Sequence, residues 1–167
     1  IKGRKVGIVV AGRSSQVAAM AGLEVPIESH ILQAFVSEGL KPAINHVVTF
    51  GMGHFYISQS DKGGLVFGGD LDFHASYAQR GNLPMMEHVM EAGMSLMPAI
   101  GKAKLLRSWG GIMDMTPDGS FIIDKTEVEN LYMDCGWCYG GFKAVPASGW
   151  CMAHLMAEDK SHEVAKR

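Results

Sequence analysis

The sequence lacks several features that would assign it at once to a class of protein. Its longest apolar runs, such as residues 6–11, are far shorter than the roughly 20 residues of a membrane-spanning helix. Its formal net charge of −2 gives no electrostatic footprint for nucleic acid or an anionic membrane. The chain opens on Ile1 without a signal-peptide pattern. Three cysteines, an odd number, do not suit a secreted disulfide framework, so a cytoplasmic location is expected.

What is present is an ordinary globular composition in a chain of 167 residues, a length that fits one domain. A hydrophobic share of 47% with 19% charged residues excludes a disordered chain. Glycine and methionine are frequent, with 21 and 12 residues. Glycines in such number indicate tight turns and close approaches of the backbone, as in cofactor sites.

Strands are expected where β-branched or alternating apolar residues end at a turn signal. These segments are residues 5–11, 27–37, 47–50, 54–59, 64–69, 104–109, 112–115, 121–123 and 131–134. Helices are expected over residues 16–21, along a methionine stripe from the N-cap Asn82 to about Pro98, and from Pro146 to Ala157. This order is α+β in character and is typical of part of a larger architecture.

The most informative segment runs from Gly136 to Lys143 and leads into the last helix. Backbone N–H groups and the positive end of a helix dipole suit a place where negative charge develops, as on the pyrimidine edge of a reduced flavin. Gly140 and Gly141 would let a flat ligand lie against the backbone, and Lys143 adds a cation for a carboxylate. An ordinary turn with a surface lysine explains the same residues equally well.

The pattern Gly-Trp-x-x-x-Gly-Phe-Lys at residues 136–143, followed by Pro146 and Gly149, resembles the C-terminal flavin motif of the glycine and D-amino acid oxidase superfamily. Within it, the chain is most similar to a C-terminal fragment of the β subunits of heterotetrameric sarcosine oxidases. Further matches occur in order along nearly the whole chain. They lie at residues 9–15, 26–30, 77–81, 107–111, 116–119, 122–123 and 130–137.

For the fold, the resemblance implies an antiparallel-sheet substrate domain together with the C-terminal part of a Rossmann-like FAD-binding domain. The GxGxxG portion of the latter is absent from the chain. Residues 1–25 would be a strand–helix piece of the FAD-binding domain, and residues 26–110 the substrate domain with the methionine-rich helix. Residues 111–167 would return to the FAD-binding domain with the flavin loop and the C-terminal helix.

For function, the resemblance implies oxidation of the C–N bond of a secondary or tertiary amino acid such as sarcosine. Hydride would pass to FAD and electrons onward, with other subunits bound and FMN at a subunit interface. Because the GxGxxG portion is absent, the chain alone is expected to be inactive. Lys143 matches the lysine that anchors the substrate carboxylate, and His54 and Tyr56 belong to a substrate-facing strand. The residues expected to contact FAD are Gly12, Gly111, Gly136, Gly140, Gly141, Phe142 and Lys143.

Other interpretations of the same residues remain open. A C-x-x-C pair followed after twelve residues by C-x-x-H has zinc-ligand spacing. Its members are Cys135, Cys138, Cys151 and His154. The C-x-x-C alone could instead be a redox pair of the thioredoxin type. A non-catalytic assembly subunit is a third alternative, because half of the cofactor site is missing from the chain.

Overall fold

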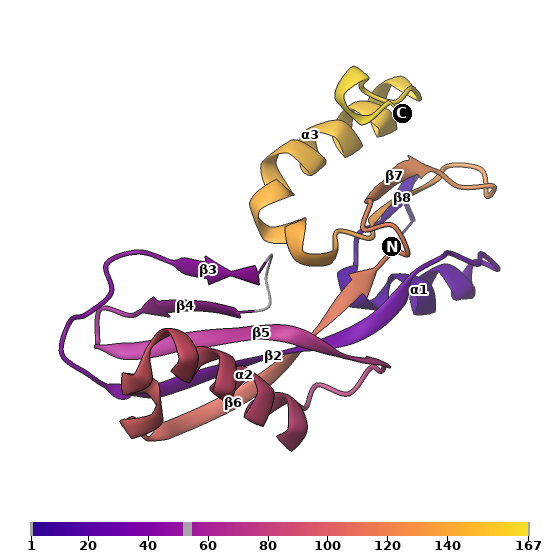
Figure 1. Ribbon diagram of the computed structural model, residues 1–167. Coiled ribbons are helices and arrows are strands. Elements are labelled where there is room, and N and C mark those ends of the chain that lie inside the picture. Colours follow the sequence, from indigo (N-terminus) through magenta and orange to yellow (C-terminus); the bar gives the residue numbers. More distant parts are fainter. Residues whose placement is uncertain (1, 52–54, 167) are drawn as a thin grey trace. The chain divides into compact units, whose positions relative to one another are not determined.

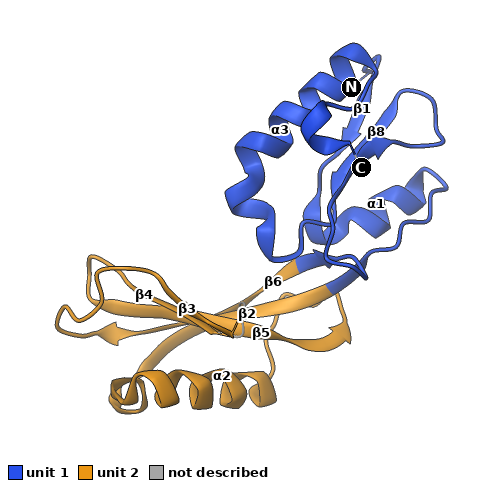
Figure 2. Cartoon of the chain, turned by 45° about the horizontal axis from the view of Figure 1, so that its top comes forward, with its two compact units in different colours: residues 1–29, 113–167 blue, residues 30–112 orange. Residues whose placement is uncertain are grey.

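Two sheets and three longer helices form the α+β structure of the chain, as expected from the sequence (Figure 1). The structure is a computed structural model and describes residues 2–51 and 55–166. The chain is divided into two compact units (Figure 2). Unit 1 consists of residues 1–29 and 113–167, and unit 2 of residues 30–112. Among the described residues, no helix combines the length and the apolar character that a membrane span requires.

Unit 1 is built on a three-stranded sheet with the strand order β1-β8-β7. Its strands and longer helices are β1 (Val6–Ile8), α1 (Ser14–Met20), β7 (Ile122–Lys125), β8 (Leu131–Cys135) and α3 (Gly141–Glu158). Short 3-10 helices add η1 (Ala11–Arg13), η4 (Cys138–Gly140) and η5 (Glu163–Ala165). β1 and β8 are parallel, whereas β7 and β8 are antiparallel.

The alternation of side chains along β8 gives unit 1 a small core on each face of its sheet. Met133 and Cys135 pack with Ile8 of β1 and Ala18 of α1. Tyr132 points the other way and packs with the α3 helix. Successive strand residues face opposite sides, so one five-residue strand joins both cores.

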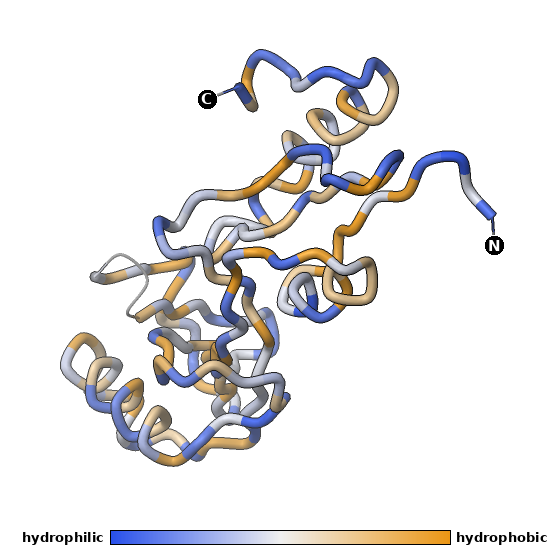
Figure 3. The backbone as a smooth tube through the Cα atoms, turned by 90° about the vertical axis from the view of Figure 1, so that its right-hand side faces the viewer, coloured by the Kyte–Doolittle hydropathy of each residue, from blue (hydrophilic) through white to orange (hydrophobic). Residues whose placement is uncertain are grey.

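A mostly hydrophilic segment follows α3 (Figure 3). It nevertheless contacts the helix, because the His162 ring packs edge-on against Trp150 and His154, with centroids 6.5 and 5.1 Å away.

Unit 2 is built on a five-stranded sheet with the order β3-β4-β5-β2-β6. Its elements are β2 (Glu28–Gly39), β3 (Val48–Phe50), β4 (Phe55–Gln59), β5 (Gly64–Ala75), α2 (Leu83–Leu96), η3 (Pro98–Lys102) and β6 (Leu105–Met115). The α2 helix lies along one face of the sheet (Figure 1). There Val89 packs with Phe35, Phe55 and Phe67 in the main core of the unit.

Several predicted elements are confirmed and others have different bounds. Asn82 caps α2 as predicted, since its Oδ1 accepts the Met85 N–H at 2.8 Å. Residues 104–109 and 112–115 are wrong as two strands, because β6 is continuous. The last helix begins at Gly141, so Pro146 lies inside it and not in its first turn.

Candidate functional site

The parallel pairing of β1 and β8 places two strand-to-helix turns at one edge of the sheet in unit 1. η1 follows β1 and contains Gly12, and Gly136 follows β8. Carboxyl ends of parallel strands are where open α/β sheets bind ligands. Each turn also holds a non-glycine residue in the left-handed region, Ala11 with φ 46° and Cys138 with φ 48°. Such strained backbone is concentrated at functional sites.

Buried side chains fix the turn after β8. Gly136 itself has φ 74°, and its N–H donates to Oδ2 of the buried Asp114 at 2.6 Å. The Trp137 indole donates to Asp134 and stacks on Phe121, with ring centroids 4.3 Å apart. Trp137 therefore holds the turn in place, and its ring is already in contact with Phe121 and Asp134.

The turn leads directly into the N-terminus of α3. The expected loop over residues 136–143 is therefore wrong at its end, because α3 begins at Gly141. Gly141, Phe142 and Lys143 form the first turn of this helix. Within residues 2–51 and 55–166, no side chain caps this N-terminus, and the first turn of the helix contains no acidic residue. The first four N–H groups of a helix have no partner within the helix. Here they are combined with the positive end of the dipole of a helix that extends to Glu158.

Lys143 is unusual in this place. A cation in the first turn opposes the helix dipole and costs about 0.3–1 kcal/mol at an exposed site. Its Nζ donates a long hydrogen bond of 3.5 Å to the Tyr139 carbonyl, in an exposed setting. Phe142 beside it is 97% exposed. Helix stability explains neither the cation at Lys143 nor the exposed ring of Phe142. A bound ligand with a negative group and a flat apolar ring would contact both side chains.

The glycines of the turn leave room for such a ligand. A Cβ built at Gly140 meets nothing within 4 Å, and the φ of Gly140 is an ordinary −91°. Gly111 belongs to β6 in unit 2, and a Cβ built there also meets nothing within 4 Å. At Gly141 the nearest atom to a built Cβ is the Trp137 Cβ at 3.3 Å. Neither backbone conformation nor packing therefore requires Gly140, and the donor-rich backbone beside it fits a planar, electron-accepting group such as flavin.

The other expected site residues belong to different elements. Gly12 is buried in η1, and its carbonyl accepts the Ser29 hydroxyl at 2.7 Å. Tyr56 lies on β4 in unit 2, and burial raises the pKa of its phenol. His54 lies outside the described residues.

The cysteines do not form the zinc site that their spacing allows. Among residues 2–51 and 55–166, no three His, Cys, Asp or Glu side chains are placed to hold a metal ion. Cys135 is fully buried, and burial together with Asp114 and Asp134 raises its pKa to about 12. Zinc ligands and redox nucleophiles are thiolates, so this environment disfavours both roles. His154 instead contacts the Lys160 carbonyl through Nδ1 at 3.1 Å.

Two residues that support the turn were missed by sequence reasoning. Asp114 and Asp134 are both 4% exposed, and burial raises the pKa of Asp134 against the lowering effect of hydrogen bonds from Trp137 and Ser148. Both lie in strands between apolar neighbours, as Met-Asp-Met and Met-Asp-Cys. Aspartate is depleted in strands, so this pattern was an available signal of a structural role.

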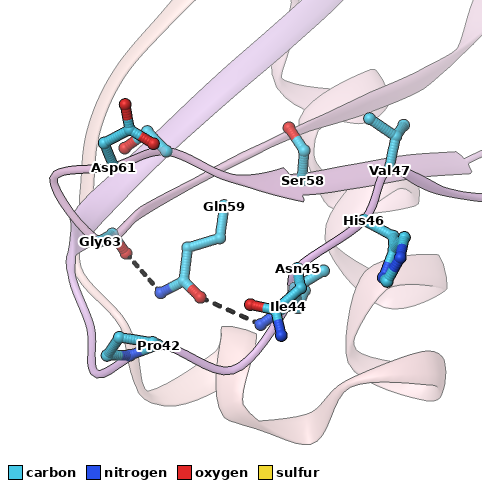
Figure 4. A pocket seen from close by; sticks show the side chains of 10 residues that line it. Pro42, Ile44, Asn45, His46, Val47, Ser58, Gln59, Asp61 and Gly63 are labelled. Atoms are coloured by element: carbon cyan, nitrogen blue, oxygen red, sulfur yellow. Dashed lines mark hydrogen bonds between the residues drawn. The ribbon is translucent and has the colours of Figure 1, made fainter.

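A hollow of about 370 Å³ lies in unit 2 beyond the end of β4 (Figure 4). Its wall includes Gln59, whose side chain bonds to the Ile44 N–H and the Gly63 carbonyl. None of the expected site residues lines it. The residues expected at the candidate site therefore do not include those that form the walls of this hollow.

Known proteins resemble the chain over most of its length. The family model described as FAD dependent oxidoreductase matches residues 2–155. The chain is 66% identical over 161 residues to a protein named sarcosine oxidase subunit beta from Rhizobium meliloti (strain 1021), covering 96% of this chain and 39% of that protein. It is 51% identical to a protein of the same name from Rhodobacter capsulatus, covering 94% and 38%. The chain thus spans about two fifths of the length of these relatives.

Solved structures share the fold. L-Proline dehydrogenase from P. horikoshii superposes with a TM-score of 0.85 at 26% identity, covering 96% of this chain and 44% of that one. Glycine oxidase from Geobacillus kaustophilus gives 0.82 at 21% identity, covering 95% and 42%. With the family model matched over most of its length, the chain belongs to the FAD-dependent oxidoreductase family.

Proposed function

We propose that the chain is part of an FAD-dependent enzyme that oxidises the C–N bond of a secondary or tertiary amino acid such as sarcosine. The relatives named sarcosine oxidase subunit beta, at 66% and 51% identity, support this substrate class. Their names also support an assembly with other subunits. Electrons would pass onward from FAD, with FMN at a subunit interface as the proposed acceptor.

The observation that carries the proposal is the N-terminus of α3. It is uncapped, contains no acid, and presents Lys143 where a cation opposes the dipole. The substrate carboxylate would balance the charge of Lys143, and the negative charge that develops on the flavin as it accepts hydride would balance the positive end of the helix dipole. Gly140, with open space where its side chain would be, lets a planar ring approach the N–H groups.

Bound FAD supplies a hydride acceptor. The N–H groups of Gly141, Phe142 and Lys143 would offer hydrogen bonds to its pyrimidine edge. Gly12, Gly111, Gly136 and Gly140 are the further residues that we propose contact it. The Lys143 ammonium would hold the substrate carboxylate and so orient the amine. His54 and Tyr56 are proposed polar contacts to that amine. Because only the neutral amine is oxidised, groups that favour its deprotonation assist the reaction.

The domain roles follow from the same proposal. Residues 1–25 and 111–167 would contribute to the FAD-binding domain and residues 26–110 to the substrate domain. The three cysteines are free thiols, which suits the reducing cytoplasm that we propose as the location.

A substrate panel tests the proposal. The natural protein, isolated with its partner subunits, is mixed without oxygen with sarcosine, dimethylglycine, proline or glycine while flavin absorbance is followed. Bleaching by a secondary or tertiary amino acid supports the proposal, and bleaching by none of them contradicts it. A preparation without flavin absorbance would favour the assembly subunit, and stoichiometric zinc in it would favour the metal site.

A further inference from the structure

The sheet of unit 2 has two different faces. Phe35, Ile57 and Phe67 point toward α2 and form the core. The alternate residues on the same strands must point to the opposite face. Within the described part of unit 2, no helix lies on that opposite face (Figure 2).

A row of side chains of very different size crosses this opposite face. Tyr56 of β4 pairs with Gly68 of β5, and Gly68 pairs with Ala34 of β2. A Cβ built at Gly68 would lie 2.8 Å from the Tyr56 hydroxyl oxygen and 3.0 Å from its ring carbon Cζ. The phenol therefore lies across β5, in the space that a side chain at position 68 would fill.

Glycine at position 68 is explained by the lack of room for a side chain beside Tyr56, and not by its backbone conformation. Gly68 does not have a positive φ, unlike its neighbour Gly69. Gly68 and Ala34 are both buried although no helix of unit 2 covers them, which agrees with a ring lying over this row. Burial also raises the pKa of the Tyr56 phenol, so the hydroxyl stays protonated and can donate a hydrogen bond.

We propose that Gly68 is a positioning residue that holds the Tyr56 hydroxyl above β5, where it meets the amine substrate. The inference rests on the proposed function for the substrate contact alone. Gly68 touches neither substrate nor cofactor and acts through Tyr56. Small Ala34 on the far side keeps the space beyond the hydroxyl free of a large side chain. A methyl group at position 68 would push the ring out of this slot.

A double-mutant cycle tests the contact in the flavin-free chain. Gly68→Ala is made in the wild-type and in the Tyr56→Ala background, and unfolding is followed in urea. The built Cβ also lies 2.6 Å from the Gln33 carbonyl oxygen, so some destabilisation is expected in both backgrounds. The effects of substitutions at two residues in contact are not additive. We therefore expect Gly68→Ala to change the unfolding constant about ten-fold less in the Tyr56→Ala background than in the wild-type protein.

The matched control is Gly64→Ala on the same strand. Its built Cβ also crowds a carbonyl of β2, 3.1 Å from the Ser37 oxygen, but none of its three nearest atoms belongs to Tyr56. Its effect should be the same in both backgrounds. If Gly68→Ala likewise has one effect in both backgrounds, including failure to fold in both, the proposal is overturned.

A kinetic cycle tests the role in catalysis. In the natural flavin-containing protein, Gly68→Ala should slow anaerobic flavin reduction by sarcosine at saturating substrate. It should cause no further loss when combined with Tyr56→Phe, whereas Gly64→Ala should leave the rate unchanged. Equal losses in both backgrounds would overturn the positioning role. Since the urea cycle needs no flavin, absence of flavin reduction would count against the proposed function and leave that cycle decisive.

Discussion

Lys143 carries a positive charge at a place in the helix where such a charge is unfavourable. It lies in the first turn of α3, where a cation opposes the helix dipole. We expect Lys143→Gln to leave stability equal or slightly higher, by about 0.3–1 kcal/mol. The kcat/KM for sarcosine should fall about ten- to a hundred-fold, because a charged hydrogen bond to the carboxylate is lost. Urea unfolding and steady-state kinetics measure the two effects.

A matched control for Lys143→Gln is Lys160→Gln, which removes a lysine beyond the other end of the same helix. It should leave kcat/KM unchanged. A variant of Lys143 that lost stability and kept its activity would show that the side chain serves the helix and not the substrate.

Asp134 gives a prediction for the dependence of stability on pH. Burial raises the pKa of its carboxyl above the ordinary value, so between these two values the folded state holds a proton that the unfolded state releases. Its contribution to stability is thus present at low pH and lost as pH rises through the raised pKa. Asp134→Asn removes the charge and keeps an acceptor for the Trp137 indole. We expect the variant to be more stable than wild type at pH 7.

The difference for Asp134→Asn should shrink as pH falls below about 4, where the unfolded aspartate also becomes protonated. Urea titrations at several pH values measure it, with Asp118→Asn in the turn before β7 as the comparison. A loss of stability that is equal at every pH would mean that geometry at Asp134 matters and its charge does not.

At the scale of elements, the features that could be predicted were those set by residues close together in the sequence. The cap of α2 by Asn82 depends on neighbours within three residues and was predicted correctly. The start of α3 was not, because Pro146 is a common first-turn residue and suggested a later start. The turn that precedes this start is held by the bond from the Gly136 N–H to Asp114, which joins residues far apart in the sequence and has no local signal.

Strand lengths depended on the same kind of distant contact. β5 continues to Ala75, beyond the predicted end at residue 69, because β2 pairs with it along that stretch through His30 and Leu32. Pairing across such irregular register cannot be derived from the alternation of one strand. For the candidate site, the sequence predicted a loop over residues 136–143, whereas the structure places Gly141 to Lys143 in the first turn of α3. The carboxylates that bond to Gly136 and Trp137 were not predicted.

Gln59, at the end of β4, clamps the segment that follows β2. Its Oε1 accepts the Ala43 and Ile44 N–H groups at 2.7 and 3.1 Å, and its Nε2 donates to the Lys41 and Gly63 carbonyls at 3.1 and 2.8 Å. Figure 4 shows the bonds to Ile44 and Gly63. Gln59→Glu keeps the acceptor and removes both donors. We expect a loss of about 2 kcal/mol, because two carbonyls then face a carboxylate without a donor. Denaturant unfolding measures it.

Ser58→Ala, at the neighbouring position of β4, is the control for the Gln59 clamp. A substitution away from such a network should change stability by less than about 0.5 kcal/mol. A Gln59→Glu variant as stable as wild type would show that the hydrogen bonds do not hold the segment.

At the scale of the whole molecule, the two units differ in how the chain builds them. Unit 2 is one continuous stretch, residues 30–112, whereas unit 1 joins residues 1–29 to residues 113–167. The core of unit 1 takes Ile8 and Ala18 from the first segment and Met133 from the second. Neither segment can bury these side chains alone, so unit 1 depends on both.

This difference predicts how the pieces behave when they are separated. A peptide of residues 30–112 should unfold cooperatively in urea, because it retains the whole α2-covered core around Phe35 and Phe67. A peptide of residues 113–167 should show no cooperative transition, since β8 loses its parallel partner β1. Adding residues 1–29 in trans should restore the transition by mass action. Cooperative unfolding of residues 113–167 alone would mean that β7, β8 and α3 suffice for a fold, and that the first segment is an addition to unit 1 rather than half of its core.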